Sequence, residues 1–127
     1  MPDFLIIENL HGIADAIELI EIRFSTIAVA DDLVMSPNGV LILDAICMRL
    51  QIIGELLKKI QKIDPLVLQG YAQIEWPNIM KLRDIISHHY DHVDHEIIFD
   101  ICKNNIPALK KAIQQILKDQ TAPGIVR

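Results

Sequence analysis

The sequence predicts an all-α fold, an up-down bundle of four to five helices. Apolar residues recur at three- and four-residue steps along most of the chain, as they do on one face of a helix. No segment shows the strict alternation of a half-buried strand, and there is no internal repeat or low-complexity tract. With 127 residues, of which 51% are apolar, the chain can bury one core. We therefore expect a single domain over residues 1–120 and a flexible tail over residues 121–127.

The first helix is predicted from a long apolar stripe. Its members follow one another at alternating four- and three-residue steps: Ile6, Leu10, Ile13, Ile17, Ile20, Phe24 and Ile27. This spacing is typical of an amphipathic helix that packs on antiparallel neighbours. Residues 29–36 are less periodic and contain Asp31 and Asp32, so we expect a loop there.

The second helix, over residues 37–63, is predicted to be the central one. Ser36 is a natural N-cap, and Pro37 suits the first helical position, where its missing N–H is no loss. Two apolar stripes then run side by side: Ile46, Leu50, Ile53, Leu57 and Ile60 in one, and Ala45, Met48, Ile52 and Leu56 in the other. A helix that is apolar over so wide an arc is buried on two sides, in a bundle or at a dimer interface.

The following segments are shorter. Asp64 and Pro65 end the long helix or cap a short new one. Residues 70–75 then lead to a helix that begins at Trp76, with Pro77 in its first turn. The apolar residues of this helix are Ile79, Leu82, Ile85 and Ile86.

Two more helices are predicted after a break near Asp91. Asp94 is the expected N-cap of the first, with Val93 and Ile98 placed as a hydrophobic staple. This helix should run to about residue 104, where the segment 105–107 restarts the chain. The last helix carries Leu109, Ile113, Ile116 and Leu117.

The charge of the chain is unevenly distributed. The net charge is −5, which argues against a surface that coats nucleic acid in general. Residues 1–57 hold two basic residues against nine acidic ones, whereas residues 58–127 hold ten against eight. A local basic rim could therefore form near Arg83, although each single lysine is more simply a solvated helix residue. The candidates for that rim are Lys58, Lys59, Lys62, Lys81 and Lys103.

The cellular setting is predicted from the termini and the cysteines. The N-terminus has no basic segment typical of a signal peptide, and no apolar run approaches the roughly 18 residues that span a membrane. We expect a cytoplasmic protein without membrane association. Cys47 and Cys102 lie in apolar helical patterns, which indicates two buried thiols rather than a disulfide or a metal site.

The helix from Trp76 concentrates the reactive side chains. Arg83, Asp84, Ser87, His88 and Tyr90 all lie off its apolar stripe. The arrangement R-D-x-x-x-H-x-Y resembles the signature of the HepT-like toxins of the HEPN superfamily, whose defining pattern is R-x(4–6)-H. The segments 53–55, 93–98 and 106–109 resemble the same family, so the resemblance covers nearly the whole chain.

This resemblance implies a homodimer that cleaves RNA without a metal or cofactor, at a site on the dimer interface. Arg83 would bind phosphate oxygens, and His88 would transfer protons near neutral pH. Five residues at about 100° each separate Arg83 from His88 by about 140° on an ideal helix, so the two do not share a face. Two copies facing each other across a two-fold axis could bring both pairs into one cleft.

Three further residues are candidates for a supporting role. Asp84 lies four residues before His88 and could orient its imidazole, although Arg83 and Asp84 also suit an ordinary surface ion pair. Ser87 lies on the same arc. Glu55 is either a residue that faces the site and pairs with a basic side chain, or an exposed helix carboxylate.

Tyr90 matches the tyrosine that, in the resembled family, is adenylylated by a partner nucleotidyltransferase acting as antitoxin. The alternative is a half-buried tyrosine at a helix end. A metal site made from the histidines and aspartates of residues 88–95 is the less favoured hypothesis, because the predicted break near Asp91 would scatter the ligands.

Two functions are therefore compared. The first is a toxin that cleaves RNA and is silenced by modification of Tyr90. The second is a non-catalytic helical protein that binds a nucleotidyltransferase or a nucleotide, with Arg83 and His88 positioning the nucleotide. They differ in whether His88 must change its protonation state, and an RNA-cleavage assay separates them.

Overall fold

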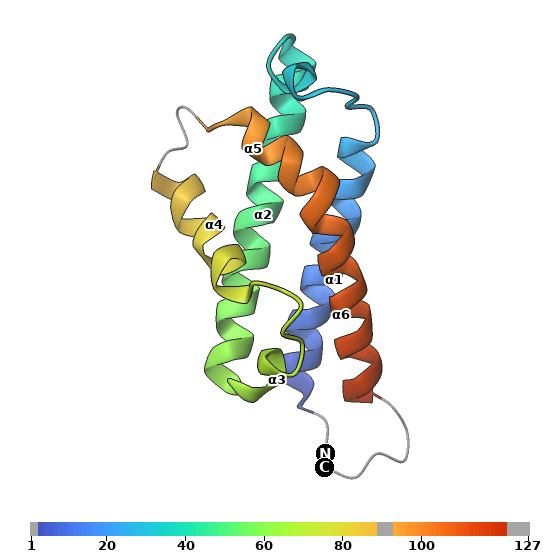
Figure 1. The fold of residues 1–127 in the computed structure, drawn as a ribbon, viewed down its shortest axis with the longest axis vertical. Helices are drawn as coiled ribbons and strands as arrows, with labels where there is room; N and C mark the ends of the chain where they lie inside the picture. The colour runs from blue at the N-terminus through green and yellow to red at the C-terminus, as the bar shows by residue number, and fades with distance from the viewer. Residues whose placement is uncertain (1–2, 89–92, 122–127) are drawn as a thin grey trace.

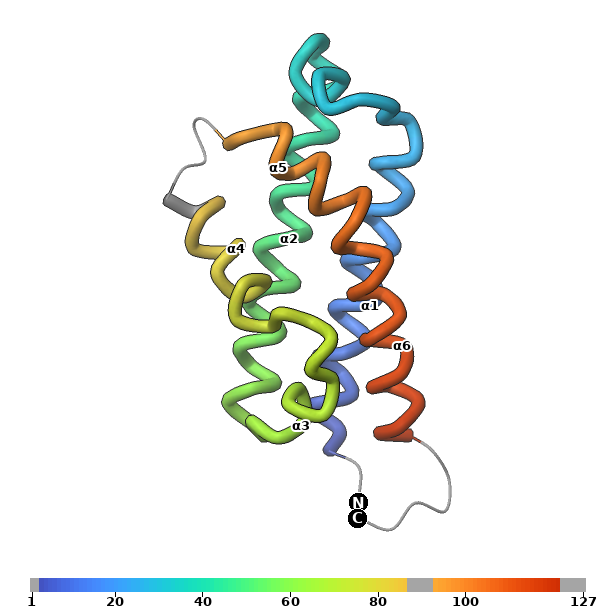
Figure 2. The backbone as a smooth tube through the Cα atoms, in the orientation of Figure 1, coloured from blue at the N-terminus to red at the C-terminus, as the bar shows by residue number. Residues whose placement is uncertain are grey.

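The computed structural model describes residues 3–88 and 93–121, and Figures 1 and 2 show them as an elongated helical bundle. The elements are α1 (Phe4–Phe24), the 3-10 turn η1 (Ala30–Leu33), α2 (Pro37–Ile63), α3 (Leu66–Gln69), α4 (Trp76–His88), α5 (His95–Asp100), the π-turn η2 (Ile101–Asn105) and α6 (Ile106–Thr121). No strand occurs among these residues, which confirms the predicted all-α class.

Helix α2 lies at the centre of the bundle, one of the two positions that its wide apolar arc predicted. It packs against α1 on one side and α4 on another, while α6 packs against α1. The stripe from Ile46 to Ile60 is buried, whereas the neighbouring stripe is only partly covered, and Met48 is 51% exposed. The wide apolar arc of α2 is explained by its two neighbours within one chain, because α1 and α4 cover different sides of it.

The predicted helix caps are also confirmed. The Ser36 hydroxyl accepts a hydrogen bond from the Gly39 N–H at 2.9 Å, with Pro37 at the first helical position. The Asp94 carboxylate accepts from the Glu96 and Ile97 N–H groups at 2.9 and 3.3 Å. Side-chain oxygens at these positions satisfy N–H groups that have no partner inside the helix.

The break between two helices that was predicted at residues 105–107 is wrong, because the helix continues through these residues. The helix passes from α5 into α6 through η2, where the Ile106 N–H donates to the Ile101 carbonyl five residues back. Pro107 explains this turn, because proline lacks an N–H and its ring clashes with the carbonyl four residues earlier. A wider turn accommodates the proline without breaking the helix.

The C-terminal end of the domain lies close to the predicted boundary. Helix α6 includes Thr121, whose hydroxyl donates to the Leu117 carbonyl at 2.7 Å. The division at residue 120 stays a prediction, and residues 122–127 lie outside the described residues, as does the expected break near Asp91.

The two cysteines are buried free thiols, as predicted. Burial and the nearby Asp44 carboxylate raise the pKa of Cys47 to about 11. Burial and the neighbouring Cys47 raise the pKa of Cys102 to about 12. Both are therefore held as unreactive thiols at neutral pH.

None of the helices within residues 3–88 and 93–121 combines the length and the apolar content that crossing a membrane requires.

Candidate functional site

Helix α4 carries the predicted site and lies on the outer side of α2 (Figure 1). Its first turn is fixed by Trp76, whose indole N–H donates to the Tyr71 carbonyl at 3.1 Å. Trp76, Met80 and Ile86 are buried, so one face of α4 joins the core. Ile85, which the sequence assigned to the apolar stripe, is 54% exposed. The outward part of α4 is thus available for contacts with other molecules.

Gly54 lets α4 approach α2 closely. A Cβ atom at Gly54 would lie 3.2 Å from the Cβ of Arg83 and 3.3 Å from the Ile79 carbonyl oxygen. Those distances leave little room for a side chain between the two helices. This role of Gly54 was not predicted from the sequence, because its packing partners on α4 are far from it along the chain.

The Arg83 guanidinium lies in a small network of charged groups at the surface. Its side chain is 44% exposed, and its Nη1 atom contacts the Asp84 carboxylate at 3.1 Å. The other Asp84 oxygen contacts Lys58 Nζ at 3.4 Å. The contact with Lys58 has the larger effect and lowers the pKa of Asp84. The contact with Arg83 lowers it further, whereas desolvation opposes both. Asp84 is therefore an anion that holds two cations in place.

The predicted contact between Asp84 and His88 cannot be compared with this geometry. The backbone of Ser87 and His88 is helical, but their side chains lie outside the described residues, as does the whole of Tyr90. The continuous helix from Arg83 to His88 agrees with the separation of about 140° around its axis. The roles of Ser87, His88 and Tyr90 stay predictions.

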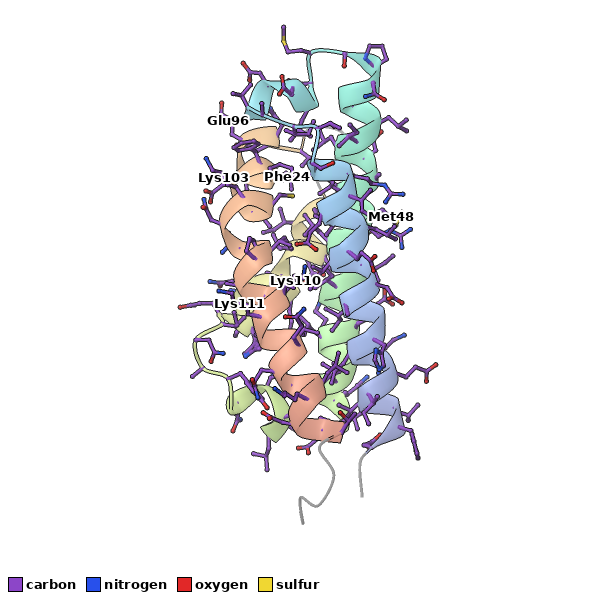
Figure 3. All side chains as sticks on the ribbon, turned by 90° about the vertical axis from the view of Figure 1, so that its right-hand side faces the viewer. Phe24, Met48, Glu96, Lys103, Lys110 and Lys111 are labelled. Carbon is purple, nitrogen blue, oxygen red and sulfur yellow. The ribbon has the colours of Figure 1, made fainter. Side chains whose placement is uncertain are left out.

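An open depression beside Arg83 gathers most of the predicted basic rim. It has a volume of about 470 Å³ and is lined by Glu55, Lys58, Lys59, Gln61, Lys62 and Arg83. Glu55 thus faces the same surface region as Arg83. Lys103 lies elsewhere, with its Nζ atom 5.8 Å from the centre of the Phe99 ring (Figure 3), and Lys81 is not among the lining residues.

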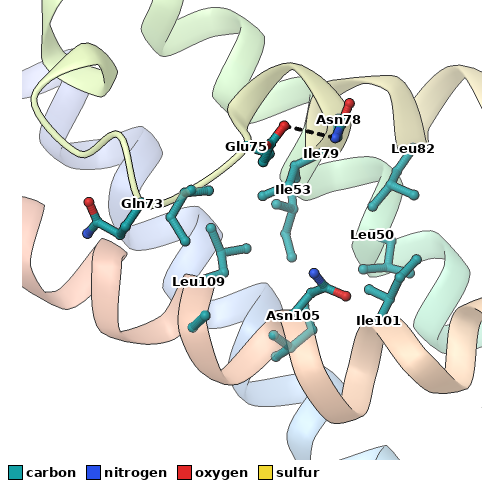
Figure 4. A pocket seen from close by; sticks show the side chains of 13 residues that line it. Leu50, Ile53, Gln73, Glu75, Asn78, Ile79, Leu82, Ile101, Asn105 and Leu109 are labelled. Carbon is teal, nitrogen blue, oxygen red and sulfur yellow. Dashed lines mark hydrogen bonds between the residues drawn. The ribbon is translucent and has the colours of Figure 1, made fainter.

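A largely apolar cavity of about 270 Å³ lies on the other side of α4, between α4, α2 and the helix formed by η2 and α6 (Figure 4). Its walls include Ile53 and Leu82, and Glu75 accepts a hydrogen bond from Asn78 at 3.2 Å at its rim. The cavity separates α4 from α6. Among the described helices, α4 packs mainly against α2. The sequence did not predict the cavity.

One group of described side chains could hold a metal ion. Asp31, His95 and Glu96 each place a ligand atom within 4.8 Å of the others, and His95 Nε2 lies 3.1 Å from the Asp31 carboxylate. The group joins η1 to the start of α5. Asp94, part of the histidine and aspartate cluster weighed above, has its carboxylate engaged as the α5 cap.

Comparison with known proteins identifies a family. The family described as "Ribonuclease HepT-like" matches residues 13–116. The "Probable ribonuclease HepT" of Thermococcus cleftensis is 31% identical over 111 residues, which cover 87% of this chain and 94% of that protein. No solved protein structure matches the chain.

Two proteins of Methanocaldococcus jannaschii are also similar. One, named "Putative RNase", is 36% identical over 75 residues, or 59% of this chain and 60% of that protein. Another, named "Gamma-glutamylcyclotransferase and putative RNase", is 32% identical over 111 residues, or 87% of this chain and 46% of that protein. The matched region thus spans about half to three-fifths of these two relatives.

Proposed function

This chain belongs to the HepT-like ribonuclease family, and we propose that it is an endoribonuclease that cleaves RNA without a metal ion. The observation that carries the proposal is the position of Arg83, half-exposed on α4 at the edge of a basic depression and five residues before His88. Arginine at such a surface is suited to bind phosphate oxygens.

The reaction would use the substrate's own nucleophile. The ribose 2′-oxygen attacks the adjacent phosphorus while a histidine takes its proton, and the bond from phosphorus to the 5′-oxygen breaks as an acid gives that oxygen a proton. The products are a 2′,3′-cyclic phosphate and a free 5′-hydroxyl. Arg83 would stabilise the charge that develops on the phosphate oxygens, and His88 would transfer the protons.

A homodimer would supply the acid and the base together. Arg83 and His88 lie on one helix at about 140° from each other, so one copy does not aim both at the same atom. Both α2 and α4 carry exposed apolar side chains, namely Leu41, Met48 and Ile85, of the kind that a dimer interface would cover. A two-fold axis there would place two arginines and two histidines in one cleft.

We further propose that the activity is that of a toxin, and that a partner nucleotidyltransferase silences it by adenylylating Tyr90. The support is the spacing R-x(4)-H-x-Y in this sequence. Tyr90 is seven residues after Arg83, a spacing that on an ideal helix would put an added phosphodiester on nearly the same face as that guanidinium. The modification would neutralise Arg83 and occupy the position of the RNA backbone.

The direct test is cleavage of a single-stranded RNA by the purified full chain in EDTA. We expect products with cyclic phosphate ends, and a loss of cleavage in His88→Ala. A dependence on added divalent metal, or unchanged cleavage by His88→Ala, would contradict the mechanism and favour the non-catalytic interaction protein. Sedimentation of the wild-type protein at micromolar concentration tests the dimer, which an active monomer would exclude.

Modification of Tyr90 is tested by coexpression with a minimal nucleotidyltransferase as the proposed partner, followed by mass spectrometry of the intact protein and its peptides. We expect a nucleotide adduct on the wild-type protein and none on Tyr90→Phe, which should remain toxic in the presence of the partner. Full neutralisation of Tyr90→Phe without any adduct would show that the partner acts by binding alone.

A further inference from the structure

The depression beside Arg83 carries a positive charge on a negatively charged protein. Four of its lining side chains are cationic, Lys58, Lys59, Lys62 and Arg83, while Glu55 is the only carboxylate among them. The whole chain has a net charge of −5. A local reversal of this kind attracts anions to one place on the surface.

The cations of this depression differ in how they are paired. Asp84 contacts both Lys58 and Arg83, so one carboxylate is shared between two cations. Within the part of the chain that the structure describes, no ion pair is recorded for Lys59 or Lys62. These two lysines thus supply the charge that a ligand can neutralise.

The spacing of Lys59 and Lys62 suits a phosphate chain. Residues three apart on a helix are neighbours, with Cβ atoms about 5–6 Å apart, so both lysines can reach one phosphate or two adjacent ones. Lysine binds phosphate as a point charge and carries no information about the base. No aromatic side chain lines the depression, so bases have no surface on which to stack.

We propose that Lys59 and Lys62 form a subsite that binds the phosphate backbone of single-stranded RNA beside the scissile bond. The inference rests on the proposed ribonuclease function, in which Arg83 lies at the reacting phosphate. The RNA strand whose reacting phosphate lies at Arg83 would continue along the last turns of α2, where Lys59 and Lys62 bind its phosphates. The subsite raises affinity for RNA of any sequence and takes no part in proton transfer.

The test measures binding of a fluorescent single-stranded RNA whose 2′-oxygens are all methylated, so that it cannot be cleaved. The full chain with Lys59→Gln and Lys62→Gln should bind this RNA about tenfold more weakly at 0.15 M salt, and the slope of log affinity against log salt should fall by about 0.7 per lysine. With cleavable RNA, KM should rise by a similar factor while kcat stays unchanged.

Two matched variants separate a local effect from a general one. Lys111→Gln with Lys118→Gln removes the same charge from exposed positions on α6, away from the depression (Figure 3 shows Lys111), and should bind RNA as the wild type does. Lys59→Arg with Lys62→Arg keeps the charge and should restore binding and the salt slope.

Several results would overturn the subsite. If the α6 variant binds RNA as weakly as the Lys59 and Lys62 variant, only the net charge of the protein matters. If the Lys59 and Lys62 variant binds RNA as the wild type does and still cleaves it, the subsite is refuted while the proposed function stays intact. Unchanged RNA binding with loss of binding to the nucleotidyltransferase would assign the surface to a protein partner. A wild-type protein that neither binds nor cleaves RNA would refute the proposed function as well.

Discussion

Helices α4 and α6 each contact a neighbouring long helix through a lysine–carboxylate pair, but the two pairs differ in charge balance. On α6, Lys110 contacts Glu21 of α1 at 3.0 Å, one cation with one anion. On α4, Asp84 contacts Lys58 of α2 and also Arg83 of its own helix. The first pair is neutral, whereas the second leaves a positive charge beside an open depression.

The two helices also differ in how they pack against the rest of the bundle. Helix α6 buries five side chains in the core, Ile106, Leu109, Ala112, Ile113 and Ile116. Helix α4 buries Trp76, Met80 and Ile86 in the core and faces an apolar cavity on the side towards α6 (Figure 4). Helix α6 thus contributes mainly to the core, whereas α4 also leaves the Arg83 and Asp84 side chains about half exposed.

The largest effect should come from removing the cation of α4. Arg83→Ala should lower the rate of RNA cleavage by about 10²–10³-fold, because developing charge on the phosphate loses its donor. The melting temperature should change little, since an ion pair at the surface contributes little to stability. Lys110→Ala on α6 is the control and should cleave normally. Equal loss in both variants would remove the distinction between the two helices.

A core truncation should act on stability instead. Ile46→Ala removes a side chain that is fully buried on α2 and should lower the free energy of unfolding by about 2–5 kcal/mol. Ile85→Ala, at a position on α4 that is 54% exposed, should change it by less than about 0.5 kcal/mol. Urea unfolding followed by circular dichroism measures both. A large cost for Ile85→Ala would mean that a second molecule covers α4 under those conditions.

A pair of glycine variants tests how closely α4 must approach α2. The added methyl group of Gly54→Ala meets the Arg83 Cβ and backbone oxygens of α4, which cannot move separately, so we expect a displaced helix at a cost of about 1–3 kcal/mol and reduced cleavage. In Gly12→Ala the nearest atom is the flexible end of Leu56 at 2.9 Å. That variant should keep its activity, and a greater loss in Gly12→Ala than in Gly54→Ala would contradict the assignment.

The smallest effect should be the pH dependence of the Asp84 contacts. The pKa of Asp84 is lowered in the folded protein, so its carboxylate stabilises the fold above the ordinary value of 3.8, and this contribution is lost as the pH falls through the lowered pKa. The melting temperature of Asp84→Asn should therefore lie slightly below that of the wild type at pH 7 and converge with it in acid. Asp15→Asn, at an exposed position on α1, is the control. A difference that persists unchanged in acid would contradict the ionic origin.

The features predicted from sequence are those that local spacing determines. The caps at Ser36 and Asp94 and the long stripe of α2 depend on residues within a few positions of each other. The contact of Asp84 with Lys58, 26 positions upstream, could not be read from such local spacing. The role of Gly54 and the cavity beside α4 likewise depend on distant segments, which no local pattern specifies.

The two buried thiols can report how often the bundle opens. Cys47 on α2 lies close enough to Cys102 on the π-turn to help raise the pKa of Cys102, and both thiols are less than 10% exposed. An alkylating reagent reaches such sulfurs only when the segments around them separate, so the labelling rate reports how often the bundle opens. The unmodified protein thereby carries a kinetic probe of the local opening of α2 and the π-turn.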